Sequence, residues 1–239
     1  MATRRSREAG ISILGWAVEE GGTRAEHDPL LNPDRIFDLV PPEPRRALVL
    51  ALLSRPGVTL GPSLARRPEV VAAISAIPGV GEVRFSPIGG TVGPGGPGWL
   101  SILFAVHLPP GQPRPLDQVL NLVRSWLMDR LGGIDLQRGR VPGAWCPGFS
   151  DLAVAGRKLV GVGFKLRRDE VLARAVICVR APTAEELETL SSCHLAFGEG
   201  VAATSLTSLA EALGRPGLTR EASLQLLGIP APPAGMILG

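Results

Sequence analysis

Cys146 and Lys158 are the side chains of this sequence best suited to covalent chemistry. They stand twelve positions apart, within an apolar stretch (residues 145–161) that turn residues interrupt. A cysteine reacts as its thiolate, and a nearby cation lowers the pKa of the thiol. A lysine can also donate hydrogen bonds to the negative oxygen that forms when a nucleophile attacks a carbonyl group. The pair therefore indicates a site for acyl transfer through a covalent intermediate.

The remaining cysteines and histidines indicate structural roles. Cys178 lies in an apolar strand pattern and is predicted to be a core residue. Cys193 precedes His194 at the end of a predicted helix, where no acid is placed to orient the histidine, so a surface or helix-terminal role is favoured over a catalytic dyad. His27 and His107 are isolated in the sequence, and no metal site is predicted. Three cysteines without C-x-x-C spacing indicate reduced thiols.

Composition favours one soluble domain in a reducing cytoplasm. The chain has 239 residues of which 45% are hydrophobic, enough to bury a large core without disulfides or metal. A net charge of +3, with arginines scattered through apolar sequence, argues against a nucleic-acid partner. The basic start and the apolar run 11–18 resemble a signal peptide, but Glu19 and Glu20 follow and no A-x-A pattern occurs. No apolar run approaches the roughly twenty residues that cross a bilayer.

Proline clusters divide the chain into three segments. Pro41 to Pro44 separate an irregular, charged N-terminal extension, 1–40, from a folded domain, 41–227. A proline-rich tail, 228–239, follows the domain and is predicted not to fold independently.

Apolar patterning within the domain predicts an α/β (α+β) fold, with a central mixed sheet flanked by helices. Run 47–53 fits either a buried strand or a buried helical turn. Strands are predicted at 58–61, 99–108, 152–154, 159–164 and 171–179, and a glycine-rich loop at 88–98. Helices are predicted at 68–77, at 116–131, from a capping box at Thr183, and at 204–213.

Several motifs resemble the biotin/lipoate protein ligase superfamily over roughly residues 45–195. The strongest is Gly156-Arg157-Lys158-Leu159-Val160-Gly161, and the segment from Arg84 to Val92 resembles the arginine and Gly-Gly loop of that superfamily. Trp145-Cys146-Pro147-Gly148, followed by Asp151, most resembles the octanoyl-[glycine cleavage system H protein] N-octanoyltransferases. The resemblance implies a biotin/lipoate ligase-like catalytic domain.

What the resemblance implies about activity is an amidotransfer. Cys146 would take an octanoyl or lipoyl group from a lysine of the glycine cleavage H protein, and a lysine of a second lipoyl domain, such as that of a 2-oxoacid dehydrogenase E2 subunit, would accept it. Lys158 would anchor the acyl carbonyl and stabilise its negative charge. The implied substrate-binding residues are Arg84, Gly89, Gly90, Thr91, Asp151, Gly156 and Gly161. Neither a metal nor a cofactor other than the acyl group is implied.

Two departures from the superfamily pattern keep alternatives open. Phe85 to Ile88 make the insert between Arg84 and Gly89 longer than the pattern has, and residues 93–96 lack a histidine that ligases often carry. Without that histidine, and with Cys146 present, a thioester mechanism suits the sequence better than ATP-dependent adenylation. An ATP-dependent lipoate or biotin ligase relative and an inactive protein that binds lipoyl domains remain the alternatives.

Overall fold

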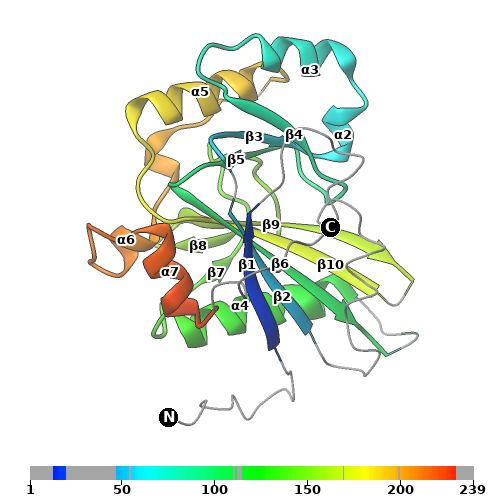
Figure 1. Ribbon diagram of the computed structural model, residues 1–239, viewed down its shortest axis with the longest axis vertical. Helices are drawn as coiled ribbons and strands as arrows, with labels where there is room; N and C mark the ends of the chain where they lie inside the picture. The colour runs from blue at the N-terminus through cyan, green and yellow to red at the C-terminus, as the bar shows by residue number, and fades with distance from the viewer. Residues whose placement is uncertain are drawn as a thin grey trace.

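A seven-stranded mixed sheet forms the centre of the protein (Figure 1). The computed structural model describes residues 13–19, 47–53, 55–109, 111, 115–168, 170–198 and 200–229. The strands of the large sheet, in spatial order, are β1 (Ile13–Glu19), β2 (Ala47–Leu53), β6 (Trp99–His107), β10 (Glu170–Cys178), β9 (Arg157–Arg167), β8 (Leu152–Val154) and β7 (Gln137–Arg138). β1 and β2 run parallel, and the other neighbours are antiparallel.

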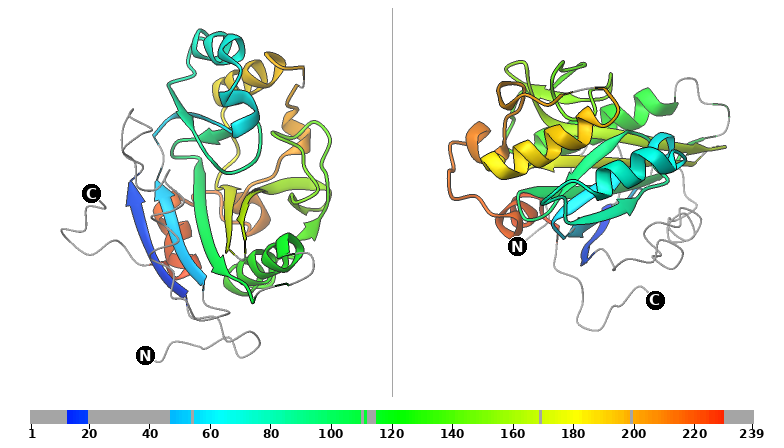
Figure 2. Two further views of the ribbon diagram at one scale, coloured as in Figure 1. Left: turned by 90° about the vertical axis from the view of Figure 1, so that its right-hand side faces the viewer. Right: turned by 90° about the horizontal axis from the view of Figure 1, so that it is seen from above.

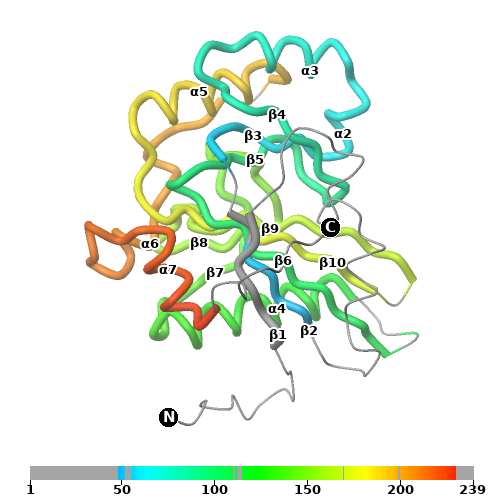
Figure 3. The backbone as a smooth tube through the Cα atoms, viewed as in Figure 1, coloured from blue at the N-terminus to red at the C-terminus, as the bar shows by residue number. Residues whose placement is uncertain are grey.

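A smaller, three-stranded sheet covers one face of the large sheet. Its strands, in the order β4, β3, β5, are Glu82–Phe85, Gly57–Leu60 and Val92–Gly95. Between β3 and β4 the chain forms α2 (Pro62–Ala65) and α3 (Pro68–Ser75), a path that Figure 3 follows on the same side of the molecule. Helix α5 (Ala184–Leu195) lies beside this layer, as Figure 2 shows from above. The small sheet therefore stands over the large one and can form a site with it.

The opposite face of the large sheet packs on helices. α4 (Pro115–Arg130) and α7 (Arg220–Leu227) lie there, and α6 (Leu209–Ala212) follows the 3₁₀ turn Ala203–Ser205. The apolar stripe of α4, which includes Val119, Val123 and Leu127, packs against β6, β9 and β10 in one core. A second core joins the small sheet, α3 and α5 to the other face. Burial on both faces explains why β6 reads as an almost unbroken apolar run.

The predicted sheet flanked by helices is confirmed, and so are several local features. Run 47–53, which the pattern left open, is strand β2. The capping box is present: Glu186 N–H donates to Thr183 Oγ1 at 3.2 Å, and Thr183 N–H donates to the Glu186 carboxylate at 2.8 Å. Cys178 is buried as expected. No helix among the described residues is long and apolar enough to cross a membrane.

Three expectations about the chain need correction. Residues 1–40 are not wholly irregular, because Ile13–Glu19 form β1 at the edge of the large sheet. The continuous helix predicted at 204–213 is wrong, because the Thr207 N–H donates to the Lys158 carbonyl at 3.0 Å and a new helix, α6, starts after Ser208, whose hydroxyl caps it. Ile229, placed in the tail, is buried, and the tail beyond it lies outside the described residues.

Cys193 and His194 are both buried, so the predicted surface role is wrong, although they do lie in the last turn of α5. The His194 Nε2–H donates to the carbonyl of Val92 at 3.3 Å, which ties α5 to β5. The other ring nitrogen, Nδ1, has no partner among the described residues. Burial therefore lowers the pKa of His194 to about 4.

His194 should make the protein less stable in mild acid. Because the folded-state pKa is about 4 against 6.5 for the free side chain, the unfolded chain binds more protons in this window. The free energy of unfolding should therefore fall as pH drops from 6.5 towards 4, by up to about 3 kcal/mol. Urea unfolding of wild type and His194→Gln across this range measures the difference, since the carboxylates titrate alike in both. Equal pH slopes for the two proteins would contradict the assignment.

Candidate active site

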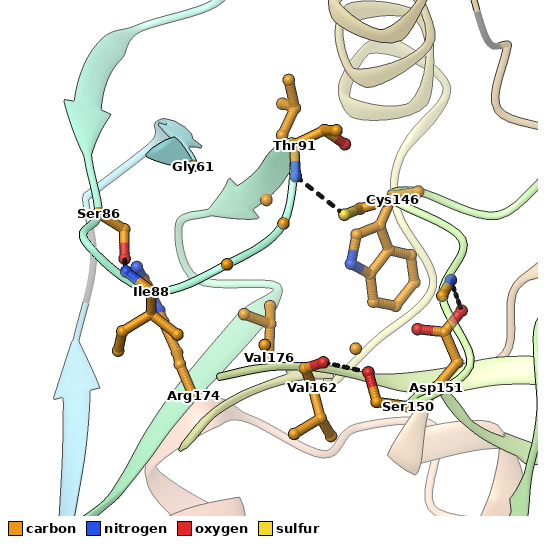
Figure 4. Close-up of a pocket in the computed structure, with 18 of the residues that line it drawn as sticks. Gly61, Ser86, Ile88, Thr91, Cys146, Ser150, Asp151, Val162, Arg174 and Val176 are labelled. Atoms are coloured by element: carbon orange, nitrogen blue, oxygen red, sulfur yellow. Dashed lines mark hydrogen bonds between the residues drawn. The ribbon is translucent and has the colours of Figure 1, made fainter. Parts of the chain in front are cut away.

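A cavity of about 460 Å³ lies between the two sheets (Figure 4). Its walls come from the loop between β4 and β5, from residues 145–151, and from strands β9 and β10. This arrangement brings together most of the residues that the sequence indicated. Those lining the cavity are Gly89, Gly90, Thr91, Cys146, Asp151, Lys158 and Gly161. Residues distant in sequence thus meet because β9 and the glycine-rich loop face each other.

Cys146 sits in a strained turn at one end of this cavity. Its φ of 42° lies in the left-handed region, which residues other than glycine seldom adopt and which is common at functional sites. The Thr91 N–H donates to Cys146 Sγ at 3.0 Å, as Figure 4 shows. This hydrogen bond holds the sulfur beside the glycine-rich loop. The side chain is half-buried, so a substrate can reach it.

Lys158 holds the backbone on which Cys146 is placed. Its side chain is fully buried, and Nζ donates to the carbonyl oxygens of Trp145 at 2.5 Å and Cys146 at 3.1 Å. Nζ also lies 2.8 Å from Asp151 Oδ1. An ammonium group has three N–H donors, and these three partners engage all of them. The prediction that Lys158 anchors the acyl carbonyl directly is therefore not supported by the geometry.

Asp151 is the counter-ion of Lys158. Its Oδ2 accepts a hydrogen bond from the Gly148 N–H at 3.0 Å, which closes the turn after Cys146. Burial raises the pKa of the Asp151 carboxyl, with Lys158 acting in the opposite direction. Burial likewise lowers the pKa of the Lys158 ammonium, opposed by Asp151. Asp151 lines the cavity, but both of its oxygens are already held, so its evident role is positioning.

Glycines at fixed places allow the loop between β4 and β5 to approach both of its neighbours. The Gly61 N–H donates to the Thr91 carbonyl at 2.7 Å, and the Gly89 N–H donates to the Phe164 carbonyl on β9 at 3.1 Å. A Cβ on Gly163 would stand 2.3 Å from the Gly89 oxygen. Gly90 has a φ of 122°, and a Cβ there would lie 3.3 Å from Cys146 Sγ. The loop is therefore held at both ends and delivers the Thr91 N–H to the sulfur.

Gly161 makes room for the buried cation. A Cβ at this position of β9 would lie 3.1 Å from both Lys158 Cε and Trp145 Nε1. The Lys158 ammonium also lies 4.5 Å from the centre of the Trp145 ring, within the range of a cation–π contact. Gly161 thus contributes to the site through packing.

Two predicted site residues lie elsewhere. Arg84, on β4, is buried and does not line the cavity; its guanidinium donates to Glu82 at 3.0 Å and to the Arg55 carbonyl at 3.1 Å. Gly156 forms the tight turn between β8 and β9 together with Ala155, and both have positive φ. That turn requires glycine for its backbone conformation. Neither residue lines the cavity, and their predicted roles in substrate binding stay predictions.

The sequence reading missed Arg174, which lines the cavity from β10. A signal was present, because a charged residue in the otherwise apolar run 171–179 must be accommodated by something other than core packing.

Among the described residues no group of three histidine, cysteine or acidic side chains could hold a metal ion.

A family model matches the central part of the chain. Residues 87–181, which include most of the loop, Cys146, Lys158 and β10, match the model of the biotin/lipoate A/B protein ligase family. The match covers less than half of the chain. A curated relative, octanoyl-[GcvH]:protein N-octanoyltransferase from Exiguobacterium sibiricum, is 28% identical over 109 residues. The match covers 42% of this chain and 39% of the relative, so the chain spans about two fifths of the relative's length.

Several solved structures share the fold of this chain. A Thermoplasma acidophilum protein with bound lipoic acid superposes with a TM-score of 0.54 at 15% identity, covering 91% of this chain and 87% of that one. Lipoate-protein ligase A bound with ATP superposes with a TM-score of 0.54 at 10% identity, covering 93% of this chain and 89% of that one. A bipartite lipoate protein ligase from T. acidophilum has a TM-score of 0.52 at 14% identity, covering 95% of this chain and 89% of that one. At these identities the likeness establishes the fold alone.

Removing the buried cation of this site should be costly. Lys158→Met leaves Asp151 as an uncompensated buried charge, and breaking such pairs typically costs about 3–5 kcal/mol. The double variant Lys158→Met/Asp151→Asn should regain part of this loss, because no net charge stays buried. Urea unfolding measures both, with Lys165→Met on the same strand as a control that changes stability by less than about 1 kcal/mol. A Lys158→Met protein as stable as the control would refute the ion-pair role.

Gly90→Ala should slow alkylation of Cys146. The added Cβ is strained at this φ and crowds the sulfur, so the loop must shift and carry the Thr91 N–H away from the thiolate. We expect the rate of modification by iodoacetamide, followed by intact mass, to fall about tenfold, a change of about 1.4 kcal/mol. Gly133→Ala is the matched control, because Gly133 also has positive φ, at 82°, but has no atom within 4 Å of the added Cβ. Wild-type rates in both variants would contradict the proposed contact.

Proposed function

We propose that this chain moves an octanoyl or lipoyl group between lysines of lipoyl-type domains, with Cys146 as the acyl carrier. The observation that carries the proposal is the Thr91 N–H held 3.0 Å from Cys146 Sγ, at the end of a largely apolar cavity. A ligase that only activates a free acid has no use for a cysteine in this position. The name of the curated relative, an N-octanoyltransferase, agrees with the proposal.

The first half-reaction forms a thioester. The Cys146 thiol loses its proton and the sulfur attacks the carbonyl carbon of an acylated lysine, giving a tetrahedral intermediate. The C–N bond then breaks, and the departing lysine nitrogen takes up a proton and leaves as an amine. The products are S-acyl Cys146 and a free donor lysine, so atoms and charge balance without an oxidant or a nucleotide.

The second half-reaction regenerates the free Cys146 thiol. The neutral amine of an acceptor lysine attacks the thioester carbonyl, the C–S bond breaks, and the proton lost by the amine restores the thiol. A thioester and an amine give a thiol and an amide, which is downhill, so the enzyme need only position the two lysines in turn at the same sulfur.

Lys158 and the Thr91 N–H stabilise negative charge at different atoms. Lys158 has its N–H groups engaged, so in this proposal it acts through its position: it fixes the Cys146 backbone and contributes a buried positive charge close to the reacting carbonyl. The Thr91 N–H stabilises the thiolate before attack and after departure.

The apolar lining suits an alkyl chain. Five apolar residues line the cavity that holds Cys146: Ile88, Val92, Val162, Phe164 and Val176. Burying each methylene group of an acyl chain among such side chains contributes about 0.8 kcal/mol. A chain of octanoyl length can therefore supply much of the binding energy for an acylated lysine.

We infer the partners from chemistry and from relatives. The relative's name contains GcvH, and one structural neighbour was solved as a ligase system with its E2 lipoyl domain. On this basis the glycine cleavage H protein and the lipoyl domains of 2-oxoacid dehydrogenase E2 subunits are the proposed donor and acceptor, and the site of action is the cytoplasm.

Intact-protein mass spectrometry with octanoylated H protein tests the acyl carrier. Wild type and Cys193→Ala should gain the mass of one octanoyl group, and hydroxylamine should remove it, whereas Cys146→Ala should gain none. Cys193 is the control because its thiol is buried and burial raises its pKa to about 11.

The same experiment separates the alternatives. If no adduct forms although the H protein binds, the transferase proposal fails. Transfer from free octanoate that requires ATP would then identify a ligase, and binding without any transfer would identify an inactive lipoyl-domain-binding protein.

A further inference from the structure

Two large apolar side chains stand exposed at the edge of the cavity. Among the described residues, the exposed large apolar side chains are Leu116, Phe149, Leu166 and Leu195. Leu116, in the first turn of α4, lines the cavity and is 39% exposed. Phe149 is 77% exposed, and its neighbours Gly148 and Ser150 both line the cavity. Single apolar residues scattered over a surface are ordinary, whereas apolar residues gathered beside a binding cavity with a polar rim are typical of an interaction site.

An ion pair ties these two positions together. Arg138 Nη1 lies 2.7 Å from Oδ1 of Asp117, the residue that follows Leu116. The Arg138 Nε–H donates to the Phe149 carbonyl at 3.1 Å. Both charged side chains are partly exposed to solvent. The two apolar side chains therefore border one polar pair, which is the combination of apolar centre and polar rim that protein interfaces have.

The turn that carries Phe149 is held on both sides. Before it, the Gly148 N–H donates to Asp151 Oδ2 at 3.0 Å, and the Asp151 N–H donates to the Gly148 carbonyl at 3.2 Å. After it, the Ser150 hydroxyl donates to the Val162 carbonyl on β9 at 2.5 Å. An exposed aromatic ring on a fixed backbone is an effective anchor for a protein partner, because little conformational entropy is lost when it binds.

The proposed chemistry brings a protein to the same place. A lysine side chain extends about 6 Å from Cα to Nζ, so a domain whose lysine reacts at Cys146 must bring its backbone within about 10 Å of the sulfur. Phe149 is the third residue after Cys146, so their Cα atoms are no more than about 11 Å apart. In Figure 4, Ser150 lies on the same side of the cavity as Cys146. The surface around such a lysine therefore comes within reach of the Phe149 ring.

We propose that Phe149 and Leu116 form the docking surface for the lysine-bearing domain, with the Phe149 ring as its anchor. This inference rests on the proposed function, which supplies the lysine. The partner surface that fits is an apolar patch beside the reactive lysine, bordered by polar groups that can pair with Arg138 and Asp117. Donor and acceptor domains use the surface in turn, because both of their lysines react at one sulfur. Phe149 does not itself line the cavity, so it binds the domain and not the acyl chain.

Calorimetric titration with glycine cleavage H protein tests the docking surface on a Cys146→Ala background, in which no thioester forms. Adding Phe149→Ala should weaken the binding of octanoylated and of unmodified H protein by the same factor, at least tenfold. Phe149→Trp keeps a large aromatic ring and should bind within threefold of the background protein. Leu195→Ala is the matched control, because Leu195 is 63% exposed at the end of α5 and does not line the cavity. Its affinity should stay within twofold.

Alkylation of Cys146 separates docking from damage to the site. With Cys146 present, Phe149→Ala should react with iodoacetamide within twofold of the wild-type rate, as intact mass measures. An unchanged affinity for H protein in Phe149→Ala, a tenfold fall in its alkylation rate, or no binding of H protein to the background protein would each overturn the inference.

The outcome of these titrations is distinguishable from that of the proposed transfer. If Cys146 becomes acylated but Phe149→Ala binds H protein as the background protein does, the transferase stands and the docking surface fails. If Phe149→Ala loses its affinity but wild type gains no acyl group, the docking surface stands on a protein that binds lipoyl-type domains without transfer.

Discussion

The buried ion pair between Lys158 and Asp151 is the constraint on which the site depends. An ammonium group without water must have each of its N–H groups bonded, and here Asp151 and the carbonyls of Trp145 and Cys146 are the partners. This requirement fixes the chain on both sides of Cys146. It also accounts for the left-handed φ of Cys146, because the turn must present two successive carbonyls to one nitrogen. The Cys146 thiol is thus positioned by the Lys158 ammonium, which cannot move without leaving Asp151 unpaired.

The same constraint extends to neighbouring elements. Gly161 must lack a side chain so that Lys158 and Trp145 fit above β9, and Gly163 must lack one so that the loop between β4 and β5 can approach the same strand. That loop then brings the Thr91 N–H to the sulfur. The two sheets share no hydrogen-bonded ladder; the second core packs them together, and the loop links them around Cys146. The glycine spacing on β9 serves this packing and needs no direct contact with substrate.

The sequence predicted the features that depend on local pattern. It did not predict the side-chain contacts that depend on residues distant in the sequence. Capping chemistry at Thr183 and the apolar stripe of α4 are local, and both were recognisable. Cys146, Lys158 and the glycine loop could be selected by residue type, but the three partners of Lys158 could not, since two of them are backbone carbonyls with no sequence signature. Arg84 was selected by its motif, but the motif says nothing about which side of β4 it occupies, and the residue does not line the cavity. Arg174 was overlooked because a single charge in an apolar strand reveals its direction only once the sheet is assembled.

A crystal structure of the protein acylated at Cys146, for example with p-nitrophenyl octanoate, tests the central claim most directly. The account predicts that the acyl chain enters the cavity between the glycine loop and β9, and that Lys158 Nζ keeps its contacts with Asp151 and the carbonyls of Trp145 and Cys146. A Lys158 that leaves Asp151 to bind the acyl oxygen, or an acyl chain that lies outside the cavity, would contradict it.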